Sequence, residues 1–431
     1  MVETEKKVQR YESYKESGVE WLGEIPEHWE VLPLFALTKL KSITNNSGLE
    51  LLSVYLDKGV IRFADVTAKR TNVTSLDLSK YQLVNLGDFV LNNQQAWRGS
   101  VGVSNYNGIV SPAYIVLSLS EKLNPDFANY LFRDSSMVSQ YLINSKGVGT
   151  IQRNLYWPSL RRSSISLPKL EEQTAIAQFL DDKTTKIDEA ITIKQQQISL
   201  LKERKQILIH KAVTRGLNPN VKLKNSGVEW IGEIPEHWEV KRVKHLLDER
   251  TERSEDGKEP LLMMSQIHGL VVRSDFHSKA EVAQNSEGNK IVKTNDLVFN
   301  KLKAHLGVFF KSNIEFDGIV SPDYAVYYSK GIFSDLKFLE LLFRNPEYIK
   351  EFICRATGIV EGLIRLYTSD LFDIHVAVPP KNEQKKILEY IETASQKIET
   401  AISLKQQEIA KLKEYKSSLI NSVVTGKVKV C

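Results

Sequence analysis

A fifteen-residue segment occurs twice in this chain of 431 residues, and it constrains the architecture more than any other feature. SGVEWLGEIPEHWEV (17–31) returns as SGVEWIGEIPEHWEV (226–240), and the two copies differ only at Leu22 and Ile231. The copies start 209 residues apart. A repeat of this length predicts two tandem domains, since the repeats of solenoid proteins are much shorter.

Two further blocks follow the same repeat. GIVSPAY (108–114) returns as GIVSPDY (318–324), and residues 172–214 resemble residues 383–425, at offsets of 210 and 211 residues. One unit of about 210 residues has therefore been duplicated almost without insertions. Between the matching blocks the halves share little, over residues 40–107 and 250–317. The chain has a shared frame that carries two unlike inserts.

Each half has the residue pattern of an α+β globule. Runs of β-branched and aromatic residues between turn signals predict strands within 51–63, 88–93 and 108–119. Apolar residues at helical spacing predict helices over 124–143 and 333–353. A strand followed by proline closes each globule, at 165–170 and 375–381.

Each half then closes with a long segment that has heptad spacing, and the first lacks proline and glycine from Glu172 to Arg215. The apolar heptad positions are Leu180, Ile187, Ile191, Ile198, Leu201 and Leu208, then Ile391, Ile398, Ile402, Ile409, Leu412 and Leu419. Lysines interrupt both patterns at matching places: Lys194, Lys205, Lys405 and Lys416. A helix of this length spans roughly 65 Å. Matching heptads predict that the two helices pack on each other; two separate surface helices are the alternative.

Because a whole globular domain joins the two helices, we expect them to run antiparallel. The predicted fold is α+β, with two tandem-duplicated globular domains separated by two long helices packed as an antiparallel coiled coil. The predicted globular domains are residues 1–166, including an N-terminal extension, and 217–377. The predicted helical segments are residues 167–216 and 378–431.

Composition narrows the class of protein. The chain is 42% hydrophobic and 26% charged, which is typical of a globular protein. No apolar run of about 18 residues could span a bilayer, and the polar first residues do not resemble a signal peptide. Two cysteines, Cys354 and Cys431, cannot form a disulfide framework, so we expect a cytoplasmic protein without membrane partners. A net charge of +5 permits nucleic-acid binding without requiring it.

Catalytic signatures are few. The chain has no GxxxxGK[ST] loop, no GxGxxG after a strand, and no HExxH or paired CxxC, so we expect neither a nucleotide site nor a metal site. SPAY (111–114) and SPDY (321–324) superficially resemble the catalytic loop of base-modifying methyltransferases. The second proline of that loop is Ala113 in one copy and Asp323 in the other. We therefore interpret both segments as Ser-Pro turns that lead into core strands.

Polar and aromatic clusters lie inside the unlike inserts, and these are the candidate binding residues. The first half contributes Asn92, Asn93, Gln94, Gln95, Trp97, Arg98, Gln152, Arg153, Asn154 and Tyr156. The second half contributes Lys301, Lys303, His305, Arg365 and Tyr367 at corresponding places. Asn and Gln suit adenine, Arg and Lys suit guanine, and both cations bind phosphate. Such side chains, placed where the halves differ, predict recognition of two different short DNA sequences; ordinary solvated loops are the alternative.

The repeated segments together resemble the specificity subunit of a type I restriction–modification system. The resemblance rests on the duplication, GIVSPAY and GIVSPDY, LPKLEEQTAIAQFLDDKT, VPPKNEQKKILEYIE and GVEWLGEIPEHWEV, and it runs through nearly the whole chain. It implies two target-recognition domains that each bind half of a bipartite double-stranded DNA site, with the helices as a spacer, in a bacterial or archaeal cytoplasm. It also implies two methyltransferase subunits that carry S-adenosylmethionine, with no cofactor in this chain, and motor-nuclease subunits for cleavage. The chain itself would then not be an enzyme.

Two other functions remain open at this level: a self-contained methyltransferase, and a coiled-coil scaffold that binds only proteins. The repeated segment itself is not expected to contact DNA, because its glutamates would repel phosphate and two nearly identical segments cannot distinguish two half-sites. We expect Trp21, Ile25 and Trp29 to pack each globule onto the helices, with Pro26 fixing a turn. A docking surface for the methyltransferase is the alternative role.

Overall fold

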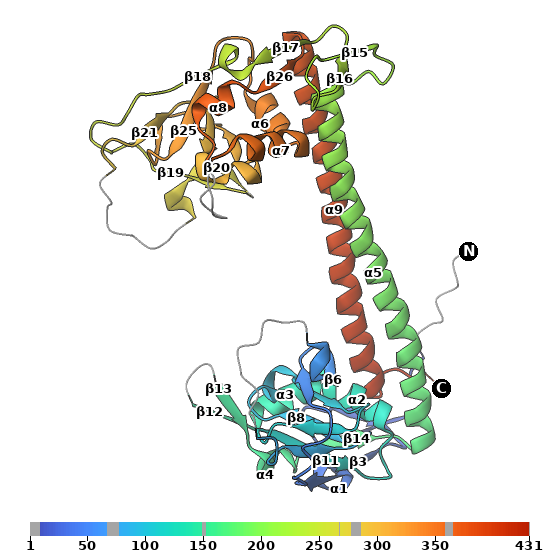
Figure 1. The fold of residues 1–431 in the computed structure, drawn as a ribbon. Coiled ribbons are helices and arrows are strands. Elements are labelled where there is room, and N and C mark those ends of the chain that lie inside the picture. Colours follow the sequence, from blue (N-terminus) through green and yellow to red (C-terminus); the bar gives the residue numbers. More distant parts are fainter. Residues whose placement is uncertain are drawn as a thin grey trace. The chain divides into compact units, whose positions relative to one another are not determined.

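A computed structural model describes residues 9–66, 77–148, 152–266, 268–276, 286–357 and 365–430. The chain divides into two compact units (Figure 1). The first unit comprises residues 1–195 and 406–431, and the second comprises residues 196–405. Each unit thus holds one globular domain, the beginning of the long helix that follows it, and the end of the other long helix.

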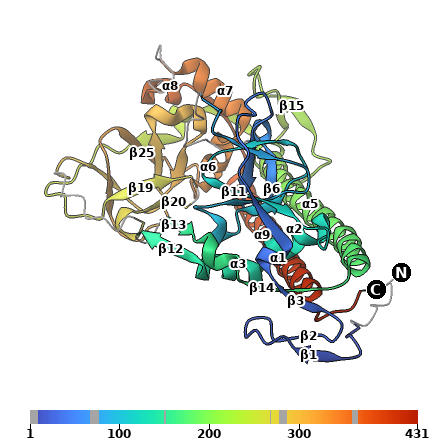
Figure 2. The same ribbon diagram turned by 90° about the horizontal axis from the view of Figure 1, so that it is seen from below.

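Short antiparallel strand pairs build the frame of each globule. In the first unit they are β1 (Tyr14–Glu16) with β2 (Glu24–Pro26) and β3 (Glu30–Pro33) with β14 (Ser164–Leu167). In the second unit they are β15 (Leu223–Asn225) with β16 (Glu233–Pro235) and β17 (Glu239–Arg242) with β26 (His375–Val378). Figure 2 shows β1 and β2 as a ribbon on the side of the first unit that carries the chain ends. The pairing of β3 with β14 brings the two ends of the globule together, so the insert between them forms a closed module.

A four-stranded antiparallel sheet occupies the centre of each globule. Its order is β4 (Thr38–Lys41), β11 (Tyr114–Leu119), β8 (Phe89–Asn92), β9 (Val101–Val103) in the first unit. In the second it is β18 (Leu247–Glu249), β25 (Tyr324–Ser329), β22 (Leu297–Asn300), β23 (Phe309–Lys311). Phe89 and Leu91 point into the main core, whereas Val90 packs in a smaller cluster on the other face, as the two-residue period of a strand requires. Apolar groups therefore cover both faces of the sheet.

Smaller strand pairs and short helices complete the globules. The first has β5 (Leu52–Tyr55) with β6 (Gly59–Arg62), β7 (Gln82–Val84) with β10 (Gly108–Val110), β12 (Ser145–Val148) with β13 (Gln152–Leu155), α1 (Leu34–Leu37), η1 (Phe63–Asp65), η2 (Ala96–Arg98) and α4 (Trp157–Leu160). The second has β19 (Leu262–Ser265) with β20 (Gly269–Val272), β21 (Lys290–Val292) with β24 (Gly318–Val320), η3 (Val243–His245), η4 (Arg273–Asp275), η5 (Lys301–Leu306) and α8 (Thr368–Phe372).

Two helices stand in each globule where the apolar spacing predicted one. They are α2 (Pro125–Arg133) and α3 (Ser135–Ile143) in the first unit, and α6 (Lys337–Phe343) and α7 (Pro346–Arg355) in the second. Asp134 breaks the first run, because its extended backbone ends α2 and its carboxylate accepts the amide of Ser136 as the N-cap of α3. Asn345 caps α7 in the same way, and Pro346 after it disfavours a continuous helix.

The long helices α5 (Leu170–Arg215) and α9 (Lys381–Val424) contain 46 and 44 residues. They run antiparallel and side by side within each unit (Figure 1). All twelve heptad side chains are buried or half-buried. Both helices end just before a glycine with positive φ, Gly216 at +73° and Gly426 at +76°. A Cβ at Gly426 would meet Pro26 Cδ at 2.5 Å, so the repeated segment presses against this helix end.

Lysines within the heptad pattern pair with acids on the opposite helix. In the first unit Lys416 lies 2.6 Å from Asp188, and Lys194 pairs with Glu408. In the second unit Lys205 lies 2.6 Å from Glu399. Three of the four heptad lysines, Lys194, Lys205 and Lys416, therefore form inter-helix ion pairs, and the flexible apolar stems of these half-buried lysines cover the seam.

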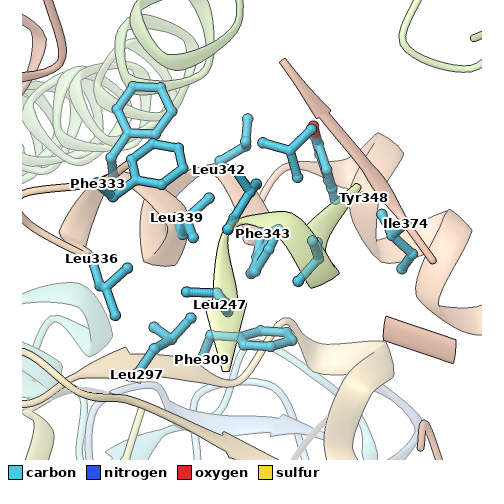
Figure 3. Packing of buried hydrophobic residues seen from close by; sticks show 14 of the residues in the cluster. Leu247, Leu297, Phe309, Phe333, Leu336, Leu339, Leu342, Phe343, Tyr348 and Ile374 are labelled. Atoms are coloured by element: carbon cyan, nitrogen blue, oxygen red, sulfur yellow. The ribbon is translucent and has the colours of Figure 1, made fainter. Parts of the chain in front are cut away.

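The repeated segment packs onto the two helices, as predicted. Ile25 and Trp29 are fully buried in a core that includes Leu180 of α5 and Val423 of α9, and Trp21 packs against the same core. The second unit repeats the arrangement with Ile234 and Trp238, and Figure 3 shows part of that core, including Phe309, Phe343 and Tyr348. Burial of two such tryptophans makes the helix–globule junction a major part of each core.

The first and last described segments of the chain also meet in the first unit. Gln9 and Lys429 form an antiparallel bridge in which the Lys429 amide donates to the Gln9 carbonyl over 2.8 Å. The Tyr14 hydroxyl donates to the Gly426 carbonyl over 3.2 Å. In the second unit a continuous segment, residues 216–223, occupies the corresponding place. Among the described helices, none combines the length and apolar composition needed to cross a membrane.

Candidate nucleic-acid interface

The two predicted clusters of the first half meet in space, and together we call them the first loop site (residues 92–98 and 152–156). Asn92 ends β8, and its side-chain oxygen accepts the amide of Gln94 to form a tight turn into η2. The Leu155 amide donates to the Asn93 carbonyl over 3.0 Å. This bond fastens the β12–β13 hairpin to the turn, although some sixty positions separate them in the sequence.

Trp97 is the centre of the first loop site. Its indole nitrogen donates to the Gln94 carbonyl over 3.0 Å, which fixes the ring. The Arg98 guanidinium lies 4.5 Å from the ring centroid and that of Arg153 lies 5.8 Å from it. Neither arginine forms an ion pair with any residue that the structure describes, so two uncompensated cations gather on one aromatic ring.

A second cation–aromatic pair extends this surface. The Lys146 ammonium lies 4.0 Å from the ring centroid of Tyr156, whose side chain is 44% exposed. Lys146 was not among the residues predicted from the sequence. Lys146 is recognised from the structure, because it pairs in register with the predicted Asn154 across the β12–β13 hairpin.

The two clusters of the second half also meet through a backbone hydrogen bond. We call residues 301–306 and 365–367, together with Asp323, the second loop site. The Leu366 amide donates to the Lys301 carbonyl over 3.1 Å. Leu366 occupies the position of Leu155, and Lys301 follows β22 as Asn93 follows β8. The frame therefore joins two unlike pairs of loops by one shared backbone hydrogen bond.

Ion pairs partly neutralise the second loop site, unlike the first. Arg365 Nη2 lies 3.2 Å from Asp323 Oδ1, and its guanidinium lies 5.9 Å from the ring centroid of Tyr367. Lys301 Nζ lies 3.7 Å from Glu249 Oε1. Burial lowers the pKa of the Lys301 ammonium, Glu249 opposes that shift, and the nearby cations Lys290 and Arg365 add to it. Asp323 is a further site residue that the sequence did not single out for binding.

The predicted residues differ in how they are presented. Gln94, Arg98, Asn154, Tyr156, Lys303 and Tyr367 are exposed, whereas Asn92, Asn93, Gln95, Trp97, Arg153, Lys301 and Arg365 are half-buried. The Asn93 side-chain oxygen is buried without a hydrogen-bond partner among the described atoms. The side chains of Gln152 and His305 lie outside the described part of the structure.

The SPAY and SPDY segments are turns that lead into core strands, as predicted. The Tyr114 amide donates to the Ser111 carbonyl over 3.0 Å, and the Tyr324 amide donates to the Ser321 carbonyl over the same distance. Each tyrosine then begins the strand at the centre of its sheet. Among the described residues, no group of three or more His, Cys, Asp or Glu side chains could hold a metal ion.

A duplicated frame that presents two unlike polar and aromatic loop sites defines a two-domain recognition protein. Residues 26–203 match the family model of the type I restriction modification DNA specificity domain. The chain is 26% identical to the MjaVIII specificity subunit of a type I restriction enzyme of Methanocaldococcus jannaschii, over 94% of each chain. It is 25% identical to the MjaIX specificity subunit of that organism, over 71% of this chain and 69% of that one.

Solved structures share the fold. One, from work on complex assembly and conformational transition of the type I restriction–modification system, matches with a TM-score of 0.65 at 15% identity, over 93% of this chain and 98% of that one. The HsdS subunit of Thermoanaerobacter tengcongensis matches with a TM-score of 0.54 at 16% identity, over 94% and 98%. The chain is therefore similar, over nearly its whole length, to specificity subunits of type I restriction–modification systems, and residues 26–203 match the DNA specificity domain of that family.

Proposed function

We propose that this chain selects the DNA on which a type I restriction–modification complex acts, by recognising a bipartite duplex with one half-site for each globular domain. In this proposal residues 1–166 and 217–377 are the two target-recognition domains. The helical segments 167–216 and 378–431 connect them and set the gap between half-sites. The observation that carries the proposal is the shared hydrogen bond, Leu155 to Asn93 and Leu366 to Lys301, which assembles unlike side chains on like frames.

The proposed DNA contacts are the residues of the two loop sites: Asn92, Asn93, Gln94, Gln95, Trp97, Arg98, Gln152, Arg153, Asn154 and Tyr156, with Lys301, Lys303, His305, Arg365 and Tyr367. Amides and guanidinium groups suit base edges in the major groove, and lysines suit phosphate oxygens. Arg98 and Arg153 support this assignment best, because each is a cation held on Trp97 without a compensating acid among the described residues. Loops that differ this much between copies suit two different half-sites.

We further propose that the chain is not itself catalytic. Two methyltransferase subunits would bind it and supply S-adenosylmethionine and the catalytic loop, and restriction subunits would join for cleavage. The third position of the two segments is Ala113 in SPAY and Asp323 in SPDY rather than a second proline, and both segments lie in ordinary turns, which supports this division of labour. The complex would act in the cytoplasm, where its DNA substrate is found.

A gel-shift experiment with the full chain and its partner methyltransferase tests the proposal. The expected result is that one bipartite duplex, selected from a random library, competes at least tenfold better than random DNA. Equal competition by all duplexes would instead favour a protein-only scaffold. Methylation of the selected duplex by the purified chain alone, with S-adenosylmethionine added, would favour a self-contained methyltransferase.

A further inference from the structure

We propose that Asp323 is a positioning residue that holds Arg365 ready to bind a guanine in the half-site of the second unit. The inference rests on the function proposed above and adds to it a specific base and a residue outside the predicted contacts. It starts from one difference: GIVSPAY and GIVSPDY are identical except for Ala113 and Asp323.

The turn does not explain why Asp323 is an acid. The same turn forms in the first unit around Ala113, with the same 3.0 Å bond between the amide of the tyrosine and the carbonyl of the serine. Asp323 is 65% exposed, so it fills no gap in the core. Among the residues that the structure describes, its carboxylate forms one ion pair, with Arg365 over 3.2 Å. An exposed pair of this kind contributes little to folding.

The electrostatics of DNA binding argue against an incidental acid. A carboxylate beside a DNA-binding surface repels phosphates, so it weakens binding unless it serves a compensating purpose. Orientation of an arginine is such a purpose. A long guanidinium side chain loses rotamer freedom when it binds, and a partner that already holds it reduces that loss.

The backbone of Arg365 is held as firmly as its side chain. Its amide donates to the Thr357 carbonyl over 2.8 Å, and the Thr357 amide donates to the Arg365 carbonyl over 3.0 Å. The next residue, Leu366, is the one bonded to Lys301. Asp323 accepts a single bond, from Nη2, which leaves other guanidinium N–H groups for a ligand.

Guanine is the base that fits this group. Arginine donates two parallel hydrogen bonds to O6 and N7 of guanine in the major groove, and this is the commonest specific protein–DNA contact. The first loop site places its arginines against the ring of Trp97 and without a carboxylate partner among the described residues. Both units place an arginine near an aromatic ring, and the second unit adds an acid, Asp323, that pairs with its arginine.

The test uses the full chain bound to its methyltransferase partner and the bipartite duplex selected from a random library. Each guanine of the second half-site is replaced in turn by 7-deazaguanine, which lacks the N7 acceptor. We expect one replacement to weaken binding by the unmodified chain about tenfold. Asp323→Ala and Arg365→Lys should each remove most of that discrimination and leave the first half-site unchanged. The double variant should lose no more than Arg365→Lys alone.

Asp317→Ala is the matched control, because Asp317 is another exposed acid, six residues before Asp323 and immediately before β24, and its carboxylate lies 4.0 Å from Lys293 Nζ. Its removal should raise affinity for all duplexes slightly without changing base preference. The proposal is overturned if Asp323→Ala behaves like this control. It is also overturned if Asp323→Ala loses the discrimination while Arg365→Lys keeps it, because Asp323 would then contact a cytosine amino group itself.

A selected second half-site without guanine on either strand would overturn this inference and leave the proposed function intact. Absence of any preferred duplex for the unmodified complex would overturn both. Asp323→Asn provides a second variant that keeps the shape of the side chain, and it should fall between aspartate and alanine in discrimination. Co-purification of each variant with the methyltransferase checks that the chain is folded.

Discussion

The indole nitrogen of Trp29 donates a hydrogen bond to Glu172 over 3.2 Å, and this bond fastens the repeated segment to the first turn of α5. The same carboxylate lies 2.7 Å from the Tyr11 hydroxyl and 2.8 Å from His28 Nε2. In the second unit the Glu383 carboxylate accepts a hydrogen bond from the indole nitrogen of Trp238 over 3.1 Å and lies 2.6 Å from His237 Nε2. The Glu-His-Trp arrangement that both units share therefore belongs to the frame, and its histidines serve a structural role.

Replacement of Glu172 by alanine should destabilise the first unit by about 1–3 kcal/mol, because the buried Trp29 N–H loses its acceptor. Glu171→Ala is the matched control: the two glutamates are adjacent in the same helical turn, but Glu171 is exposed. Hydrogen exchange of amides in the first unit measures the loss of stability caused by each variant, and the amides of the second unit serve as the reference. Equal loss of protection in both variants would show that only the charge near the helix start matters.

The Asp188–Lys416 pair should report directly on the packing of α5 against α9. A double-mutant cycle with Asp188→Asn and Lys416→Gln should give a coupling of about 0.2–1 kcal/mol, since both side chains are partly exposed. The coupling should shrink in high salt because the pair is screened. Lys413→Gln, at an exposed position of α9, should show no coupling to Asp188. A coupling of zero for Lys416 would mean that the ion pair does not contribute to the packing of α5 against α9.

Arg98→Ala should weaken binding of the selected duplex about tenfold when the methyltransferase is bound. If Arg98 contacts a phosphate, the slope of log affinity against log salt should fall by about 0.9. Arg62→Ala is the control, because Arg62 also lies over an aromatic ring, that of Tyr106, but already pairs with Glu50. Unchanged affinity and salt slope for Arg98→Ala would exclude it as a DNA contact.

Exchange of the insert in the first unit for that of another specificity subunit should change one half-site and preserve the other. The exchanged segment should start at residue 38, so that β4 stays whole. The exchanged segment then ends with α4, just before β14 pairs with β3. Sequencing of methylated motifs in cells gives the result. Simultaneous change in both half-sites would contradict independent recognition domains.

Periodicity was sufficient to predict the long helices and the tryptophan junctions. Apolar residues at heptad spacing leave water by packing against each other on two helices. The repeated segment has large apolar side chains at Trp21, Ile25 and Trp29, which suit a core. Short-range patterns failed where one polar side chain decides the local backbone. Asp134 divides a run of helical spacing into two helices because its carboxylate caps the second.

The sequence predicted which segments form the loop sites but not how those segments contact each other. Residue types indicated which segments differ, but the bond between Leu155 and Asn93 joins distant segments through backbone atoms, which every residue has. The lysines that interrupt the heptads, and Asp323 in its turn, likewise acquire meaning from a partner far away in the chain. The residues near such a side chain in the sequence do not predict its distant partner.

The bridge between Gln9 and Lys429 has a practical consequence for labelling. Val428 and Val430 pack against the core of the first unit, and Tyr14 holds the carbonyl of Gly426, so the tail is part of that unit. A fluorophore attached at residue 9 and one attached at residue 429 would therefore lie beside the same bridge. A probe at one of these two positions and a quencher at the other would follow fraying of this junction, and its signal would report on the first unit alone.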